Sequence, residues 1–275
     1  MDVTTARTPL LDGNTIPQLG LGVYKVDNDD AARLVEHAIS VGYRLVDTAS
    51  MYENEEGVGE GLRRSGIQRS DIQIATKFWL DDLGYDNTLK AAQRSLERLG
   101  VDYLDFFLIH WPAPQRGLYV DSWRALEKLR EDGVVRSIGV CNFHSEHIDA
   151  IRAHSEHLPV LNQVELHPWL TQNRLREYHQ AHGIVTQAWA PLARGQVLDE
   201  PVLLDLAGHY GVSVAQLVLR WHLQRGVAVI PKSNSPARIT ENADVFGFVL
   251  EPEHVNVISA LNRDYRTGVD PNDRN

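Results

Sequence analysis

Cysteine and long apolar runs are almost absent from this sequence. Cys141 is the single cysteine among 275 residues, so the chain can form no internal disulfide and no CxxC metal knuckle, which favours a reducing compartment. No stretch approaches the roughly 20 apolar residues of a membrane span, and the N-terminal MDVTTARTPLLDG has no apolar segment of signal-peptide length. These absences predict a cytoplasmic protein without a membrane partner.

Basic charge is also scarce. The chain has 27 Lys and Arg against 37 Asp and Glu, a formal net charge of −10, and its basic residues are scattered along the sequence. Such a distribution repels the phosphate backbone of nucleic acids. We therefore expect no nucleic-acid partner.

Several common catalytic motifs are missing as well. The sequence has no GxGxxG, no GK dipeptide for a phosphate-binding P-loop, no HExxH and no GxSxG. Two pairs, His144 with His147 and His179 with His182, place imidazoles near one helical face, but both lie in polar segments without a nearby third ligand. We interpret them as solvated helix faces and expect no metal site, with zinc as the weaker alternative.

The composition is that of an ordinary globular protein, with 43% hydrophobic and 23% charged residues. A length of 275 residues fits either two domains or one α/β barrel. Eight apolar runs alternate with segments whose apolar residues recur every three or four positions, as in a helix with one buried face. The runs are LGLGVYKV near residue 20, YRLVDTA near 45, DIQIATKF near 75, LDFFLIH near 107, VRSIGVCNF near 139, VLNQVEL near 163, IVTQAWAPL near 188 and VAVIPKS near 230.

Eight strand and helix units without a break predict an α/β protein, a (β/α)8 TIM barrel. The runs are mostly apolar, as expected of parallel strands that are covered on both faces. A doubly wound sheet is the alternative, but it usually has fewer strands. Because no linker interrupts the units, we expect residues 1–275 to form a single domain. Asp86-Asn87 and Ser213 stand where helix N-caps are expected.

Three further segments lie outside the eight units. Asp12-Gly13, between two short apolar stretches, predicts an N-terminal β-hairpin that could plug the N-terminal mouth of the barrel. EPEHVNVISALNRD predicts an extra C-terminal helix. The polar tail TGVDPNDRN that follows is expected to be mobile.

Polar side chains stand at the C-terminal ends of the predicted strands. In a barrel these ends converge on one mouth, where the chemistry of such folds takes place. Strand ends are often polar simply because they are wet, but an acid, a lysine and a histidine on three successive strands form a plausible proton-transfer site. The residues are Asp47, Lys77, His110, Asn142, Gln163, Trp189 and Lys232, with Tyr52 on the loop after the second strand.

The chemistry of this set is specific. A phenol titrates near ~10, and a neighbouring ammonium such as Lys77 lowers its pKa by stabilising the phenolate. Asp47 can keep Lys77 charged, and His110 can hydrogen-bond a carbonyl oxygen. The set can stabilise and protonate an alkoxide, but it contains no nucleophile or metal. A bound hydride donor is therefore expected.

At these residues the sequence resembles the aldo-keto reductases, and the resemblance covers nearly the whole chain. It is carried by GLGVYKV, DTASMYENEEGVGEGL, TKFW, DFFLIHWP, RSIGVCNF, NQVELHP, IPKS and the EN of RITEN, in family order. The bacterial branch that contains 2,5-diketogluconate and methylglyoxal reductases is most similar. The resemblance implies NADPH-dependent reduction of aldehydes, ketones or small dicarbonyls. It also implies that Tyr52 donates the proton, that Lys77 and Asp47 lower its pKa, and that His110 orients the substrate.

The resemblance further implies a cofactor, NADPH/NADP+, that lies extended across the mouth. Asn142 and Gln163 would hold the nicotinamide carboxamide, and Trp189 would stack on the ring. Independently of the family, a lysine and a hydroxyl at the end of the eighth strand stand where many barrels bind phosphate. The implied cofactor-binding residues are Gly22, Val23, Asp47, Asn142, Gln163, Trp189, Ala190, Pro191, Leu192, Lys232, Ser233, Asn234, Arg238, Glu241 and Asn242.

Substrate residues are implied in the same way. Tyr24, Trp79 and Trp111 would wall a substrate pocket beside His110. A mouth with three aromatic residues and few evident cations favours small dicarbonyls or hydrophobic aldehydes over strongly anionic sugars.

Three positions depart from the family pattern. Cys141 stands where a serine is common, Ser235 where relatives have a second arginine, and Glu53 where glycine is common. Glu53 is expected to narrow or charge the substrate mouth.

Two other functions stay open at this point. The same family includes potassium-channel β subunits, so a cofactor-binding regulatory subunit is one alternative. A barrel isomerase or lyase that uses the IPKS phosphate site is the other, although Asn142, Gln163 and Trp189 have no evident task there. The family likeness, and the absence of an evident self-pairing segment, predict a monomer that acts on a small-molecule carbonyl substrate.

Overall fold

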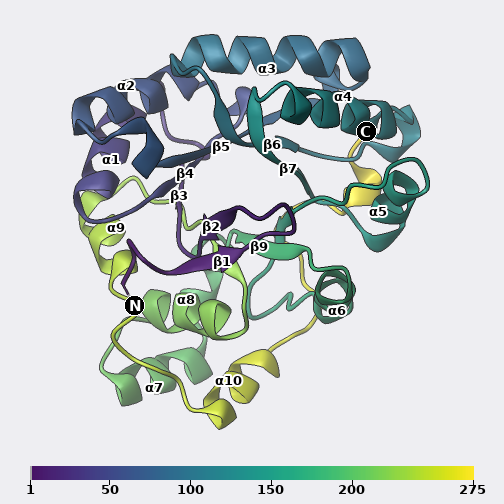
Figure 1. Cartoon of the computed structure of the whole chain (residues 1–275). Coiled ribbons are helices and arrows are strands. Elements are labelled where there is room, and N and C mark those ends of the chain that lie inside the picture. Colours follow the sequence, from purple (N-terminus) through teal and green to yellow (C-terminus); the bar gives the residue numbers. More distant parts are fainter. Residues whose placement is uncertain (1) are drawn as a thin grey trace.

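A sheet of eight parallel strands forms the centre of the protein, in a computed structural model that describes residues 2–275 (Figure 1). The strands lie in the sheet in chain order, from β3 to β10. Each predicted run contributes one of them, so the predicted alternation is confirmed. The strands are β3 Leu21–Gly22, β4 Leu45–Asp47, β5 Gln73–Phe78, β6 Leu104–Ile109, β7 Val135–Cys141, β8 Leu161–Glu165, β9 Val185–Trp189 and β10 Ala228–Val229.

The sheet closes on itself where its first and last strands meet. Gly20 N donates to Val229 O at 2.9 Å, and Gly22 N donates to Pro231 O at 3.1 Å. A Cβ atom on Gly22 would lie 2.8 Å from Ile230 O, so this approach of two backbones requires glycine. The closed ring of parallel strands is the predicted (β/α)8 barrel.

The helices lie outside the ring of strands (Figure 1). The predicted N-cap at Ser213 is confirmed, because Ser213 Oγ accepts from Gln216 N. The predicted cap at Asp86-Asn87 is wrong: α3 begins at Tyr85, so these residues lie in its first turn. The helices are α1 Asn28–Ser40, α2 Glu55–Ser65, α3 Tyr85–Leu99, α4 Tyr119–Glu131, α5 Ser145–Arg152, α6 Asn173–Ala181, α7 Pro201–Tyr210, α8 Val214–Gln224, α9 Pro236–Ala243 and α10 Pro252–Ser259.

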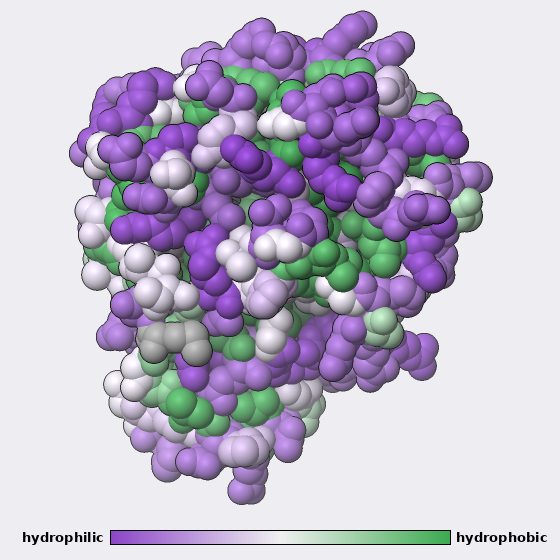
Figure 2. Space-filling model, in the orientation of Figure 1, coloured by the Kyte–Doolittle hydropathy of each residue, from purple (hydrophilic) through white to green (hydrophobic). Residues whose placement is uncertain are grey.

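No single helix within residues 2–275 is long and apolar enough to cross a membrane. Only α7 and α8 taken together reach that length and composition, and they meet at an angle of 88°. The face drawn in Figure 2 is mostly hydrophilic, with apolar side chains scattered over it.

The predicted N-terminal hairpin is present and lies across one end of the barrel (Figure 1). Strands β1, Arg7–Pro9, and β2, Thr15–Pro17, pair antiparallel, and Gly13 has a φ of 84° in the turn between them. Ile16 is fully buried, in one cluster with Leu45 and Phe106 from the barrel interior. The hairpin therefore closes the end of the barrel that is opposite to the C-terminal strand ends, as predicted.

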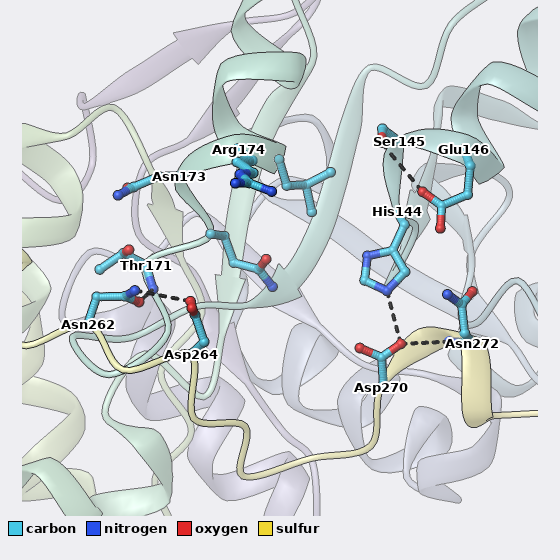
Figure 3. A pocket seen from close by; sticks show the side chains of 12 residues that line it. His144, Ser145, Glu146, Thr171, Asn173, Arg174, Asn262, Asp264, Asp270 and Asn272 are labelled. Carbon is cyan, nitrogen blue, oxygen red and sulfur yellow. Dashed lines mark hydrogen bonds and ion pairs between the residues drawn. The ribbon is translucent and has the colours of Figure 1, made fainter.

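The prediction of a mobile tail is wrong. The backbone N–H groups of Thr267 and Gly268 donate to the buried Glu165 carboxylate, at 2.6 and 3.1 Å. Further along, His144 Nε2 lies 3.0 Å from Asp270 Oδ1, which also accepts from Asn272 N (Figure 3). The segment is polar because it carries hydrogen-bonding groups for distant parts of the chain. These contacts hold it against the C-terminal ends of the strands.

The histidine pairs are not uniformly solvated, which corrects their interpretation. His147 and His179 are buried, and His179 Nδ1 hydrogen-bonds Thr186 Oγ1 at 2.9 Å. Burial lowers the pKa of His179 to about 3, so its ring is neutral. Within residues 2–275 no group of three or more His, Cys, Asp or Glu side chains is placed to hold a metal ion. The buried rings serve as packing and hydrogen-bonding groups.

Candidate active site

A cleft of about 1150 Å³ opens at the C-terminal ends of the strands. Many of the residues that line this cleft were singled out from the sequence. They come from the ends of all eight strands and from helix α9. Those that line it are Gly22, Tyr24, Asp47, Tyr52, Trp79, His110, Trp111, Asn142, Gln163, Trp189, Ala190, Pro191, Leu192, Lys232, Ser233, Asn234, Arg238, Glu241 and Asn242.

Asp47 and Lys77 form a buried ion pair at the floor of this cleft. Lys77 Nζ lies 2.6 Å from Asp47 Oδ1 and donates to Thr48 O at 2.7 Å. Burial raises the pKa of Asp47. Burial also disfavours the charged form of Lys77, but the negative charge of Asp47 and its hydrogen bond outweigh that effect and raise the pKa of Lys77. The ammonium is therefore held charged, as expected, below the surface of the cleft.

Tyr52 lies above this pair, at the end of the 3₁₀ turn Ser50–Tyr52. Its ring centre is 5.1 Å from Lys77 Nζ and 5.6 Å from the His110 ring centre. The expectation of a lowered phenol pKa is wrong for the protein as described. Burial raises the pKa of Tyr52 above its usual value, and the charge of Lys77 offsets only part of that shift. Tyr52 therefore keeps its proton at neutral pH.

His110 follows β6 and faces Tyr52 from the other side. Its Nδ1 atom is buried and has no hydrogen-bond partner within residues 2–275. Burial, together with the charges of Lys77 and Arg274, lowers the pKa of His110 well below 6.5. The ring is neutral, so it can hydrogen-bond a carbonyl oxygen without acting as a strong acid.

Two amides form the next part of the wall. Gln163 Nε2 donates to Asp47 Oδ2 at 2.7 Å and to Gln187 Oε1 at 2.8 Å. Asn142 Nδ2 donates to the His110 carbonyl at 2.9 Å, while Asn142 Oδ1 accepts from the Trp189 indole at 2.8 Å. Asn142 has a φ of 61°, a left-handed conformation that asparagine tolerates better than most residues. These bonds fix both amides and the indole in one orientation.

Cations gather where the cleft runs towards α9. Lys232 and Arg238 are exposed there, beside Ser233. Burial and the neighbouring charge of Lys25 lower the pKa of Lys232. Like charges at close range favour a bound anion between them. Lys25 was not singled out from the sequence, although it belongs to the GLGVYKV segment.

Some residues that the sequence singled out do not line the cleft. Val23 has its side chain in the core, and Lys77 is fully buried against Asp47 and the Tyr52 ring. Cys141 is fully buried in the barrel interior. Glu53 is exposed and does not line the cleft, so the expectation that it narrows or charges the mouth is wrong.

Other lining residues were not predicted. Most belong to loops and to the tail, where neither periodicity nor a motif marks a contact. They are Lys25, Met51, Arg194, Gly195, Leu198, Ser213, Val214, Ala215, Ile230, Pro231, Thr267, Gly268, Val269 and Arg274.

Comparison with known proteins identifies the family. The profile described as "Aldo/keto reductase family" matches residues 17–263, so the chain belongs to this family. It is 50% identical over 265 residues to a glyoxal reductase of Bacillus subtilis, covering 96% of this chain and 95% of that protein. It is 43% identical over 264 residues to the methylglyoxal reductase DkgA of Escherichia coli, covering 95% of each chain.

Solved structures agree with the fold. A variant of Gox0644 in complex with NADPH is 46% identical, covers 98% of each chain and superposes with a TM-score of 0.94. An aldo-keto reductase of Bombyx mori in complex with NADP is 37% identical, with 96% and 95% of the chains covered and a TM-score of 0.89. The predicted family, TIM barrel and oxidoreductase class are confirmed, and so is NADP(H) as a cofactor of this family.

Proposed function

We propose that this chain catalyses the NADPH-dependent reduction of aldehydes, ketones or small dicarbonyls to alcohols. The observation that carries the proposal is the cluster on the floor of the cleft, in which the partly buried Tyr52 lies over the buried Lys77, Asp47 and His110. The relatives named as glyoxal and methylglyoxal reductases support small dicarbonyls as the substrate class.

The polar atoms of the cleft fit the nicotinamide part of the cofactor. Both N–H groups of Gln163 are used inside the protein, which leaves its Oε1 as an acceptor on the cleft wall. Asn142 keeps one N–H and one acceptor position beyond its two internal bonds. A carboxamide offers the matching donors and acceptor, so we assign Asn142 and Gln163 to it. Trp189, whose indole N–H is tied to Asn142, would offer its ring face for stacking.

The other end of the cleft fits a phosphate. Lys232, Arg238 and Lys25 bring three cations to a region that also carries the Ser233 hydroxyl. We assign Lys232, Ser233, Asn234 and Arg238 to the adenosine 2′-phosphate and the neighbouring Glu241 and Asn242 to the adenine side. Gly22, Ala190, Pro191 and Leu192 would supply the walls between the two ends.

We assign the following roles to the residues of the floor. When bound, NADPH supplies the hydride. His110, as a neutral ring, hydrogen-bonds the carbonyl oxygen and fixes its position between the walls formed by Tyr24, Trp79 and Trp111. Tyr52 holds a proton beside the same oxygen and donates it as negative charge develops there. Lys77 stabilises the phenolate that remains, and Asp47 keeps Lys77 charged.

A cofactor-binding subunit without turnover is the second candidate. It would need the phosphate and carboxamide contacts but not the buried Lys77–Asp47 pair, whose burial costs desolvation energy that binding alone does not require. That pair favours the enzyme.

The proposal is tested by following NADPH consumption with a panel that contains methylglyoxal, glyoxal, a diketogluconate, an aromatic aldehyde and a keto ester. Turnover of at least one small dicarbonyl is expected. Binding of NADPH, seen as quenching of tryptophan fluorescence, without turnover of any member would favour the regulatory subunit instead.

We also propose that residues 1–275 form one domain and that the protein acts as a monomer in the cytoplasm. The closed barrel supports a single domain, and the lone buried Cys141 is consistent with a reducing compartment. Light scattering after gel filtration should give a mass near 31.0 kDa, and a mass twice as large would reject the monomer.

A further inference from the structure

Glu165 is a buried carboxylate to which the proposed reaction gives no task. It stands at the end of β8, and its side chain is fully buried. No lysine or arginine in the described part of the chain pairs with it, and its ionisable neighbour is the buried His167, whose Nε2 lies 3.2 Å from Glu165 Oε1. Such a carboxylate costs desolvation energy unless hydrogen bonds satisfy it.

The tail supplies most of these hydrogen bonds. Thr267 donates to Glu165 Oε1 through its backbone N–H at 2.6 Å and its hydroxyl at 2.5 Å, and Gly268 N donates to Glu165 Oε2 at 3.1 Å. Burial disfavours the charged form of Glu165, but the hydrogen bonds from His167 and Thr267 outweigh that effect and lower the pKa of the carboxyl. Because hydrogen bonds to a charged acceptor are the strong ones, the carboxylate fixes residues 267 and 268 over the end of β8.

Gly268 is also the residue of the tail that lies against Trp189. A Cβ atom built on Gly268 would lie 2.7 Å from Trp189 Cη2 and 3.1 Å from Glu165 Oε2, so the backbone of the tail, the indole and the carboxylate are in close contact. Glu165 and Trp189 are register partners on β8 and β9. The indole N–H donates to Asn142 Oδ1 at 2.8 Å. The ring is therefore held by Asn142 at its N–H and by the tail at its six-membered ring.

Other contacts anchor the tail on both sides of this point. Upstream, Tyr265 N donates to Trp169 O at 3.0 Å. Downstream, Asp270 Oδ1 lies 3.0 Å from His144 Nε2 (Figure 3). Loss of the contacts to the carboxylate would therefore release the two residues that lie against the indole without detaching the whole tail.

Resting on the function proposed above, we propose that Glu165 is a positioning residue for the nicotinamide end of the cofactor. Its carboxylate holds Gly268, Gly268 limits the motion of the Trp189 ring, and that ring offers its face to the nicotinamide. A side chain that is free to rotate loses rotamer freedom when a ligand stacks on it, so a ring that is fixed beforehand binds the nicotinamide more tightly. The phosphate end of the cofactor is held by other residues and does not depend on Glu165.

The test compares NADPH with 2′-phospho-ADP-ribose, which lacks the nicotinamide, by isothermal titration calorimetry. Glu165→Gln keeps the size of the side chain but turns one acceptor into a donor, so the tail loses at least one hydrogen bond. The Kd for NADPH should rise about three- to tenfold, and that for 2′-phospho-ADP-ribose should stay within twofold. Glu165→Asp, which keeps the charge, should recover part of the affinity for NADPH.

A milder variant leaves the buried carboxylate in place and guards against misfolding. Thr267→Val removes only the hydroxyl donor, so the Kd for NADPH should rise about two- to fourfold, again without a change for 2′-phospho-ADP-ribose. Asp270→Asn is the matched control, because Asp270 is a second carboxylate that anchors the tail but does not line the cleft. It should leave both affinities within twofold of the wild type.

A double-mutant cycle with Trp189→Ala tests the route of the effect. If Glu165 acts through the indole, Glu165→Gln should change the Kd for NADPH by less than twofold once the ring is gone. Three results would overturn the positioning role: an undiminished effect in the Trp189→Ala background, equal weakening of NADPH and 2′-phospho-ADP-ribose, or the same loss in Asp270→Asn.

These binding measurements separate this inference from the proposed function. A wild type that reduces no carbonyl compound, while Glu165→Gln selectively loses affinity for NADPH, would reject the reductase and keep the positioning role. Turnover of methylglyoxal by the wild type, with the affinity for NADPH unchanged in both Glu165→Gln and Thr267→Val, would keep the reductase and overturn the positioning role.

Discussion

At the scale of single residues, burial decides the protonation of the proposed catalytic cluster. The Tyr52 phenol and the His110 ring are both held in their neutral forms, with the pKa of Tyr52 raised and that of His110 lowered. The sequence could supply the residue types and their spacing, because strand ends converge. It could not supply the sign of the Tyr52 shift, because that depends on how much of the phenol is removed from water.

A pH prediction follows from these directions. Reduction needs the phenol, which stays protonated because its pKa is raised above 10, so kcat/KM for reduction at saturating NADPH should be flat from about pH 6 to pH 9. Oxidation of the product alcohol needs the phenolate and should rise throughout that range. Lys77→Met removes the charge that favours the phenolate. In this variant kcat/KM for alcohol oxidation should be lower than in the wild type at every pH of that range. A fall of the reduction rate with a midpoint below pH 9 would contradict the raised pKa.

Cofactor preference is a second property of single residues. Arg238→Ala removes one cation assigned to the 2′-phosphate, so the Kd for NADPH should rise about tenfold while that for NADH stays unchanged. The wild type should bind NADPH at least ten times more tightly than NADH. Arg33→Ala, which removes an exposed arginine on α1 that pairs with Asp30, is the control. Equal affinities of the wild type for both cofactors would remove the phosphate assignment.

At the scale of elements, the strands could be predicted and the tail could not. Apolar runs and helical periodicity are local signals, so each strand could be placed from its own residues. The partners of the tail lie far away in the chain: Thr267 donates to Glu165 and Asp270 pairs with His144. No local pattern marks such contacts, and a polar segment with distant partners resembles a solvated one. Arg274 was missed for the same reason.

Gly268→Ala tests how the tail fits the cleft. A Cβ atom there would lie 2.7 Å from the Trp189 side chain and 3.1 Å from Glu165 Oε2, so the tail or Trp189 must move. Overpacking of this kind costs about 1–3 kcal/mol of unfolding free energy, and the Kd for NADPH should rise as Trp189 shifts. Gly208→Ala on α7, where a Cβ meets nothing within 4 Å, is the control and should be neutral or slightly stabilising. Urea unfolding that gives the two variants equal stability would contradict the tight fit.

At the scale of the whole molecule, the hairpin that contributes to stability and the cleft proposed for catalysis lie at opposite ends of the barrel. The hairpin closes one end through Ile16, while the cleft lies at the other. The sequence indicated this division through the Asp12-Gly13 turn and the polar strand ends, because both are strong local signals. How the loops and the tail complete the mouth depends on packing between distant segments, and the substrate preference lies there.

Ile16→Ala should lower the unfolding free energy by about 2–5 kcal/mol, because it leaves a cavity under the barrel. Its kcat/KM should stay within twofold of the wild type, since the hairpin lies at the end of the barrel opposite to the cleft. Leu11→Ala in the same hairpin, at a side chain that is 51% exposed, should change stability by less than about 0.5 kcal/mol. Loss of activity in folded Ile16→Ala would show that the two ends are coupled.

The most direct test of the whole account is Tyr52→Phe, measured for both NADPH affinity and turnover of methylglyoxal. The substitution removes the phenolic proton and keeps the ring. We predict an unchanged Kd for NADPH and a kcat/KM lower by about 10² to 10⁴, the usual contribution of a general acid. A variant that binds NADPH normally and reduces methylglyoxal at the wild-type rate would contradict the assignment of Tyr52 as the proton donor, and with it the mechanism.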